Sequence, residues 1–119
     1  MQQFDSRIKP TSEQVKAMEK FTKYDKSKVE EHFDALASTY ETVYNLVGYP
    51  DPQQCADYVT EFASDLGLGD NCDIVDFACG TGLVGEHLKS AGFKKIFGLD
   101  VSENMLEIAK AKNIYTSLR

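Results

Sequence analysis

The sequence predicts an α/β fold in which helices precede a β-α-β-α unit. In the first half of its 119 residues, apolar residues recur at steps of three and four, the period of an amphipathic helix. In the second half, two short apolar runs, 72–77 and 94–100, are separated by a glycine-rich turn and an amphipathic segment, 83–91. This order and spacing predict two parallel strands joined by a right-handed helical crossover.

Two helices are expected before the first break in the chain. The first spans about 11–24. The second follows Ser27, which forms a capping box with Glu30, and ends near Gly48 because Tyr49-Pro50 cannot continue it. The apolar face of the second helix consists of Val29, Phe33, Leu36, Ala37, Tyr40, Val43, Tyr44 and Val47. A long face of this kind predicts a helix that packs against other elements.

A third helix is expected to begin at Asp51. Asp51 is a favourable N-cap, Pro52 suits the first helical position, and Gly67 is a favourable C-terminal stop. The buried face is predicted from the period to be Cys55, Tyr58, Val59, Phe62, Ala63 and Leu66. In the second half, Gly92 ends the crossover helix, and Ser102 caps a last helix that reaches about Asn113.

Composition and charge exclude several classes of function. The chain has 42% hydrophobic residues and 13 basic against 19 acidic side chains, a net charge of -6. The hydrophobic share is that of one globular domain and is too high for a disordered tail. An acidic protein lacks the broad basic face that binds phosphate backbones, so no nucleic-acid partner is expected.

Sequence features also predict where the protein resides. The polar start, MQQFDSRIKP, has no apolar segment typical of a secretory signal, and no apolar run approaches the ~20 residues that span a bilayer. Cys55, Cys72 and Cys79 are odd in number and lack CxxC spacing. This favours free thiols in a reducing compartment over disulfides or a metal site. We therefore expect a cytoplasmic protein with no metal and no membrane contact.

The glycine-rich turn carries the strongest functional signal. Gly80, Gly82 and Gly85 form a GxGxxG pattern between a predicted strand and a predicted helix. Glycines leave the backbone open to a ligand, and the N–H groups at the start of a helix point toward it. Asp100 ends the next strand, 20 residues after Gly80, where a carboxylate can accept hydrogen bonds from a ribose diol. The pattern in this context predicts a nucleoside-binding site.

The acidic residues around the turn indicate which nucleoside ligand binds. Asp76 lies four residues before Gly80, and Asp100 lies on its other side. Two carboxylates would repel the pyrophosphate of a dinucleotide, each by roughly a kcal/mol or more in a partly buried site. They suit a ligand with an ammonium group at one end and a ribose at the other. S-adenosylmethionine carries both groups and a sulfonium, so the charge pattern favours it over NAD.

Three segments resemble motifs of class I S-adenosylmethionine-dependent methyltransferases. The run VDFACGTG at 75–82 resembles motif I, and GLDVSENMLEIAK at 98–110 resembles the post-I motif. The run HFDALASTY at 32–40 resembles the FDxxAxxYD segment that precedes the core of such enzymes. The closest resemblance is to small methyltransferase-like proteins of the Williams–Beuren-region type. They share the acidic-x-A-C-G-T-G turn, in which Ala78 replaces a motif-I glycine.

The resemblance implies S-adenosyl-L-methionine as the cofactor and assigns roles by position. Asp76 would hold the methionine amino group, the backbone of 78–82 would pass beneath the methionine and ribose, and Asp100 would bind the ribose hydroxyls. The cofactor-binding residues implied in this way are Tyr40, Asp76, Ala78, Cys79, Gly80, Gly82, Asp100, Val101 and Met105.

Two of these residues have an alternative role in packing. Val101 and Met105 would pack on the adenine, and Tyr40 would close over the carboxypropyl end. Tyr40 and Met105 also lie on the apolar faces of their helices, where core packing accounts for them equally well. Cys79 is interpreted as a small residue in a tight turn. No grouping of residues points to a catalytic nucleophile.

The resemblance also implies a truncated Rossmann-like methyltransferase fold. We expect an N-terminal helical cap at 1–67 and the first half of the cofactor-binding core at 68–119. Relatives build a seven-stranded sheet, of which this chain would supply two strands and no acceptor pocket. Three functions stay open. The first is a methyltransferase with an unknown acceptor, whether or not it is active by itself. The second is a non-catalytic interaction protein that pairs with itself or a partner subunit through its exposed sheet edge, and the third is an NAD-binding oxidoreductase fragment.

Overall fold

The computed structural model of the protein describes residues 11–48 and 50–119. The polar run 1–10, on which the predicted absence of a secretory signal rests, lies outside these residues. Within them, no helix combines the length and apolar character needed to cross a lipid bilayer. The same residues contain no group of three or more His, Cys, Asp or Glu side chains placed to hold a metal ion.

Helices form the first half of the described chain. Their bounds are α1 (Ser12–Thr22), the 3-10 helix η1 (Lys26–Lys28), α2 (Val29–Val47) and α3 (Asp51–Asp65). The predicted capping box at Ser27 is wrong, because Ser27 lies within η1 and donates through its N–H and its hydroxyl to Asp25 Oδ1. Gly48 ends α2 in the left-handed conformation, with φ 65°, as predicted from its position.

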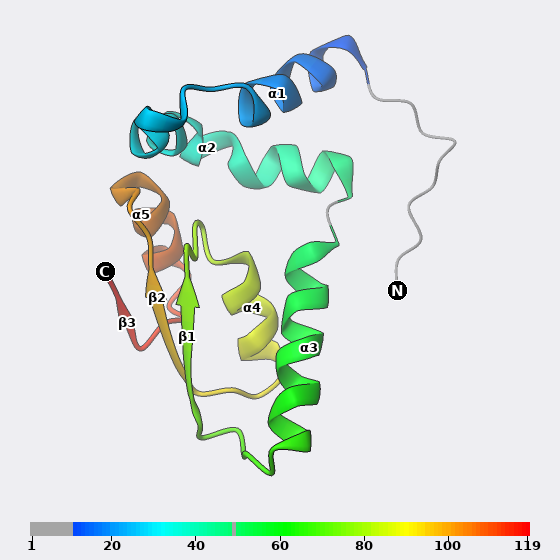
Figure 1. Ribbon diagram of the computed structural model, residues 1–119, viewed down its shortest axis with the longest axis vertical. Helices are drawn as coiled ribbons and strands as arrows, with labels where there is room; N and C mark the ends of the chain where they lie inside the picture. The colour runs from blue at the N-terminus through cyan, green and yellow to red at the C-terminus, as the bar shows by residue number, and fades with distance from the viewer. Residues whose placement is uncertain (1–10, 49) are drawn as a thin grey trace.

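The second half alternates strands and helices. The elements are β1 (Asp73–Phe77), α4 (Leu83–Ser90), β2 (Lys95–Leu99), α5 (Glu103–Ala111) and β3 (Ser117–Leu118). The strands form one parallel sheet in the order β1-β2-β3, which confirms the α/β fold (Figure 1). The expected number of two strands is wrong. β3 was missed because two residues are too few to show an alternating pattern.

The hydrophobic core lies between one face of the sheet and the helices α3 and α4. Leu88 of α4 and Ile96 of β2 are almost fully buried and share a cluster with Ala56 and Ala63 of α3. On β1, Ile74 packs against this cluster. Successive side chains of a strand point to opposite faces, so Val75 and Phe77 lie on the other face, and both are exposed.

The predicted buried face of α3 is largely wrong. Pro52, Ala56 and Ala63 are the buried residues of this helix, and Val59 packs beside them. Four residues of the predicted face are exposed instead: Cys55, Tyr58, Phe62 and Leu66. Both sets recur at helical spacing and lie on adjacent sides of the helix. The alanine-bearing side faces α4, where small side chains let the two helices approach closely, and the aromatic side is left uncovered.

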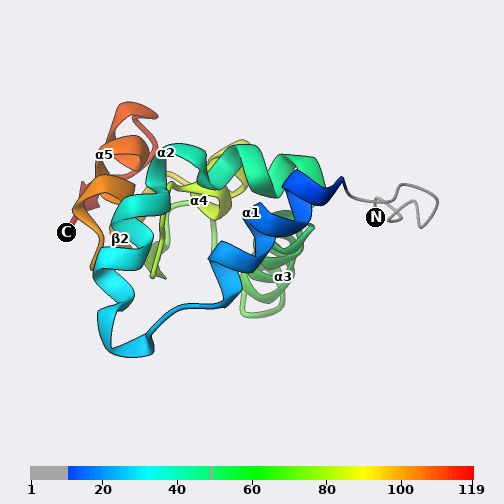
Figure 2. The same cartoon turned by 90° about the horizontal axis from the view of Figure 1, so that it is seen from above.

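Helix α2 lies across the carboxyl end of β1 and packs against α5 (Figures 1 and 2). Asp34 of α2 joins the start of α5, because its Oδ1 accepts hydrogen bonds from Ser102 Oγ and from Asn104 N–H. Lys112 forms ion pairs with Glu41 of α2 and Glu86 of α4. These polar contacts fix α2 above the sheet and place its middle next to the glycine-rich turn.

Candidate functional site

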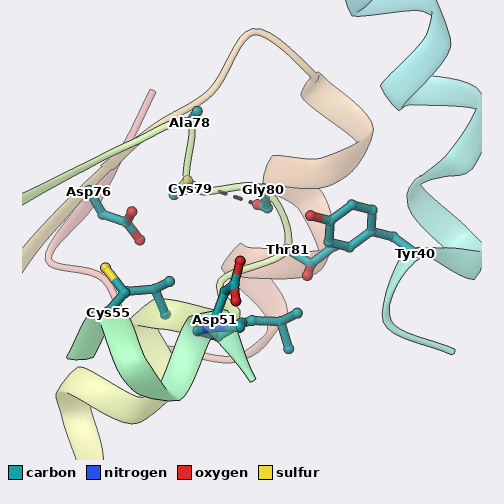
Figure 3. A pocket seen from close by; sticks show the side chains of 11 residues that line it. Tyr40, Asp51, Cys55, Asp76, Ala78, Cys79, Gly80 and Thr81 are labelled. Atoms are coloured by element: carbon teal, nitrogen blue, oxygen red, sulfur yellow. Dashed lines mark hydrogen bonds between the residues drawn. The ribbon is translucent and has the colours of Figure 1, made fainter. Parts of the chain in front are cut away.

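A cavity of about 260 Å³ lies where α2, the first turns of α3 and the loop after β1 meet (Figure 3). Tyr40 reaches it from α2, Asp51 and Cys55 reach it from α3, and Asp76 reaches it from β1. The remaining lining residues are Pro52, Ala78, Cys79, Gly80, Thr81, Leu83 and Val84. The cavity therefore has two carboxylates and an aromatic ring around a turn of backbone.

The turn itself adopts a conformation that few side chains permit. Ala78 has φ 55°, Gly80 has φ 56° and Gly82 has φ 92°, all in the left-handed region. A Cβ atom at Gly80 would meet no heavy atom within 4 Å, so the space beside this glycine is open. Cys79 N–H donates to Leu99 O at 3.0 Å, which ties the turn to β2. The sheet thus holds the turn in its strained shape.

Asp100 braces the turn from the end of β2. Its Oδ2 accepts a hydrogen bond from Gly80 N–H and its Oδ1 accepts one from Ser102 N–H, each at 2.8 Å. The carboxylate therefore links the glycine turn to the start of α5. An ionised carboxylate has about four lone-pair sites, so these two bonds leave acceptor capacity on each oxygen.

Asp76 is the half-buried carboxylate of the cavity. Burial raises its pKa, the hydrogen bond from Tyr115 lowers it, and the charge of Asp100 raises it further. Tyr115 Oη donates this hydrogen bond to Asp76 Oδ2 at 2.8 Å. Burial and the nearby Asp76 charge raise the pKa of Tyr115 well above its usual range, so its hydroxyl remains a donor.

Two polar side chains of the turn differ in what they can do. Cys79 is buried, and burial together with Asp76 and Asp100 raises the pKa of its thiol to about 12. A thiol with this pKa is protonated at neutral pH and is a poor nucleophile. Thr81 Oγ1 is buried and has no hydrogen-bond partner in the described part of the chain. A buried hydroxyl without a partner beside a cavity is a candidate ligand contact.

The structure brings together some of the residues predicted for this site. Tyr40, Asp76, Ala78, Cys79 and Gly80 line the cavity. The other four predicted residues, Gly82, Asp100, Val101 and Met105, are not part of its lining. Asp100 is linked to the lining by the hydrogen bond that it accepts from Gly80 N–H. The roles of all nine residues in binding a cofactor stay predictions.

Val101 and Met105 differ in exposure. Val101 is 62% exposed, whereas Met105 is 1% exposed and packs inside the protein. The alternative reading of Met105 as a packing residue therefore agrees with its burial.

Sequence reasoning missed four residues of the site that carry polar side chains. Asp51 and Cys55 were read as elements of helix capping and packing, although both reach the cavity from α3. Thr81 was passed over inside the glycine pattern. Tyr115 lies 39 residues after its partner Asp76, and no local pattern connects the two.

Comparison with known proteins identifies the domain. Residues 74–118, which run from the second residue of β1 through the turn, α4, β2 and α5 to the end of β3, match the family model described as a methyltransferase domain. The chain carries part of a class I methyltransferase domain. Over 86 residues it is 35% identical to human methyltransferase-like protein 27, covering 72% of this chain and 34% of that protein.

A bacterial enzyme gives a second match to the methyltransferase domain. The chain is 35% identical over 96 residues to the demethylmenaquinone methyltransferase of Lactococcus lactis subsp. lactis (strain IL1403). This match covers 76% of the chain and 36% of that enzyme. The chain therefore spans about a third of the length of the curated relatives it matches.

Proposed function

We propose that this part of the methyltransferase domain binds S-adenosylmethionine in the cavity beneath α2. The observation that carries the proposal is the position of Asp76, whose carboxylate lies in the cavity beside the glycine turn. The lining fits the cofactor in charge, because Asp51 and Asp76 suit its ammonium and sulfonium groups. The hydroxyl of Thr81 and the open space at Gly80 offer a polar contact and room for the ligand.

Each residue of the site has a proposed task. Asp76 holds the amino group of the cofactor, and Asp100 uses its remaining acceptor capacity for the ribose hydroxyls. The backbone of the turn passes beneath the ligand, and the ring of Tyr40 covers its amino-acid end and excludes water. Val101, which is exposed next to Asp100, is free to contact the adenine.

The cofactor supplies an activated methyl group on a sulfonium, which a nucleophile of the acceptor can attack. Catalysis by methyltransferases depends on holding donor and acceptor in line in a dry pocket. The residues described here orient the donor. The Lactococcus lactis relative is named for demethylmenaquinone, and no residue of this cavity argues for that acceptor. Three free cysteines favour a cytoplasmic setting.

Isothermal titration of the purified chain tests the proposal. S-adenosylmethionine is titrated into the protein, and NADH is titrated in a parallel experiment. We expect binding of S-adenosylmethionine and a loss of about tenfold or more in affinity for Asp76→Asn, since a charged hydrogen bond contributes roughly 1.5–3 kcal/mol. Asp73→Asn, on the same strand but outside the cavity lining, is the matched control and should bind normally. Tighter binding of NADH would overturn the proposal.

We propose a second function, compatible with the first: two copies of the chain pair through the free edge of β1. β1 is an edge strand of the sheet, so one side of its backbone has no strand partner in the described residues. Val75 and Phe77 are exposed beside this edge. On α3, the exposed face runs from Cys55, which shares the cavity with Asp76 at the end of β1, to Leu66.

Charge and area both favour a second copy as the partner. Antiparallel pairing of two β1 strands centred on Val75 sets Ile74 opposite Asp76 and Asp73 opposite Phe77, so no two carboxylates oppose each other. Phe77, which belongs to β1 itself, is 76% exposed. At ~150–250 Å² when fully exposed, it supplies part of the ~800 Å² per partner that a stable interface buries.

Sedimentation velocity over a range of protein concentrations tests this pairing. We expect a dimer whose population rises with concentration. Val75→Lys should give a monomer, because the two lysines would meet directly across the antiparallel pair. Val15→Lys, on the exposed side of α1, is the control and should leave the dimer intact. A monomer at all concentrations would overturn the proposed pairing and leave the cofactor proposal unaffected.

A further inference from the structure

The ring of Tyr115 occupies a slot made by glycines of three different segments. A Cβ atom at Gly85 of α4 would lie 2.5 Å from Tyr115 Oη, and one at Gly98 of β2 would lie 2.9 Å from ring carbons. A Cβ atom at Gly82 of the turn would lie 3.1 Å from the ring. Real Cβ atoms do not approach as closely as the first two distances. The position of Tyr115 therefore requires glycine at 85 and 98.

This changes how the GxGxxG pattern is interpreted. Gly80 leaves open space beside the turn, as expected for a glycine that admits a ligand. Gly85 instead faces the side of the turn where Tyr115 lies. The third glycine of the pattern therefore makes room for a tyrosine that follows it by 30 residues in the chain.

The hydroxyl of Tyr115 contacts the Asp76 carboxylate, which is the group proposed to bind the ligand. It donates to Asp76 Oδ2, and this is the only hydrogen bond to the Asp76 side chain within the described residues. Asp76 points into the cavity, as Figure 3 shows. One carboxylate oxygen is thus held by Tyr115, and Oδ1 is left for a ligand.

We propose that Tyr115 is a positioning residue that fixes the Asp76 carboxylate for recognition of a ligand ammonium group. The proposal rests on the proposed function, because the ammonium group is that of the S-adenosylmethionine amino-acid end. Tyr115 does not touch the ligand. It acts by limiting the rotation of the carboxylate, so that binding an ammonium group costs less conformational freedom.

Tyr115 also keeps the carboxylate in the form that binds a cation. Burial raises the pKa of Asp76, and the hydrogen bond from Tyr115 opposes this rise. The other titratable side chains of the lining are those of Tyr40 from α2, Asp51 and Cys55 from α3, and Cys79 of the turn, and Asp100 lies behind the turn. None of them is a cation. Removal of the hydroxyl should therefore raise the pKa of Asp76 further. As the pH is lowered, the variant should then lose ammonium binding at a higher pH than the unchanged protein does.

Tyr115→Phe separates these effects from packing, because the ring still fills the glycine slot. The ligands are S-adenosylhomocysteine, which carries the amino-acid end, and methylthioadenosine, which lacks it. We expect Tyr115→Phe to bind S-adenosylhomocysteine about tenfold more weakly at neutral pH and methylthioadenosine as the unchanged protein does. Tyr24→Phe is the control, since Tyr24 stacks on His32, away from the cavity, and it should change neither affinity. Equal weakening of both ligands by Tyr115→Phe would overturn the proposal.

A measurement without ligand separates this inference from the proposed function. The pKa of Asp76 is followed through the chemical shift of its carboxyl carbon in the unchanged protein and in Tyr115→Phe. We expect a higher pKa in the variant, and an equal or lower pKa would overturn the positioning role whatever ligand the cavity takes. Failure of the unchanged protein to bind S-adenosylhomocysteine, with the pKa difference present, would instead overturn the proposed function.

Discussion

At the residue scale, Gly85 of α4 shows how the absence of a side chain at one position makes room for a functional side chain, that of Tyr115, from another part of the chain. Gly85→Ala would put a Cβ atom 2.5 Å from Tyr115 Oη, so the ring or α4 must shift. Overpacking of this kind costs ~1–3 kcal/mol. We expect urea unfolding to show a loss in this range. Gly69→Ala is the matched control, since a Cβ atom there meets nothing within 4 Å. Equal stability of the two variants would contradict the glycine slot.

Asp76 illustrates a conflict between stability and ligand binding at one residue. Burial raises its pKa, so the ionised form is less favourable in the folded protein than in the unfolded chain. The resulting cost is fully present above the raised folded pKa, decreases as the pH falls through it, and is gone below the pKa of the unfolded chain. Asp76→Asn keeps an acceptor for Tyr115 and removes the charge. We expect this variant to unfold at a higher urea concentration at pH 7 but not in acid, although it binds S-adenosylmethionine poorly. A loss of stability at pH 7 would contradict the assigned burial cost.

At the element scale, α2 owes its position above the cavity to polar contacts with α5. Asp34→Ala removes the acceptor of Ser102 Oγ and of Asn104 N–H. We expect a loss of about 1–2 kcal/mol in the free energy of unfolding and faster hydrogen exchange at the Asn104 amide. The exposed Thr42 lies on the same helix, and Thr42→Ala should change neither quantity. Unchanged exchange at Asn104 in Asp34→Ala would show that the contact does not hold α5.

The helices and the first two strands could be predicted from the sequence because their signals are local. Ser102 caps α5 by accepting from Met105 N–H, as its position before an apolar period predicts. The buried side of α3 could not be predicted in this way, because Ala56 and Phe62 belong to adjacent faces that both show helical spacing. Which face packs depends on how closely α4 approaches, and that is a property of the assembled fold.

For the site, the turn and its acidic residues could also be predicted, since a strand, a glycine pattern and a helix follow one another directly. The contribution of Tyr115 could not be predicted from the sequence. It depends on a contact with a residue 39 positions earlier and on the absence of Cβ atoms in two other elements, and no short sequence pattern indicates either. The position of Asp51 at the cavity likewise follows from the packing of α3 against α4.

At the scale of the whole molecule, one side of the fold is well covered and the other is apolar and open. α4 packs on the face of the sheet that carries Ile74 and Ile96. The opposite face presents Val75 and Phe77, which neighbour Phe97 and Leu99 on β2. Exposed apolar surface beside an unpaired strand edge is typical of an interface. This asymmetry is the physical basis for the proposed pairing of two copies.

The net charge of the molecule makes the proposed pairing testable through salt. Each copy carries a formal charge of -6, so two copies repel each other at long range while their apolar surfaces and strand edges attract at contact. Raising the ionic strength from ~0.02 M to ~0.3 M shortens the screening length from roughly 20 Å to roughly 6 Å and weakens only the repulsion. We therefore expect the dimer to become more stable with added salt in sedimentation velocity. Val75→Lys should stay monomeric under both conditions, because its defect lies at the contact. A dimer that dissociates as salt is added would instead indicate association through ion pairs and would exclude the β1 edge as its main attraction.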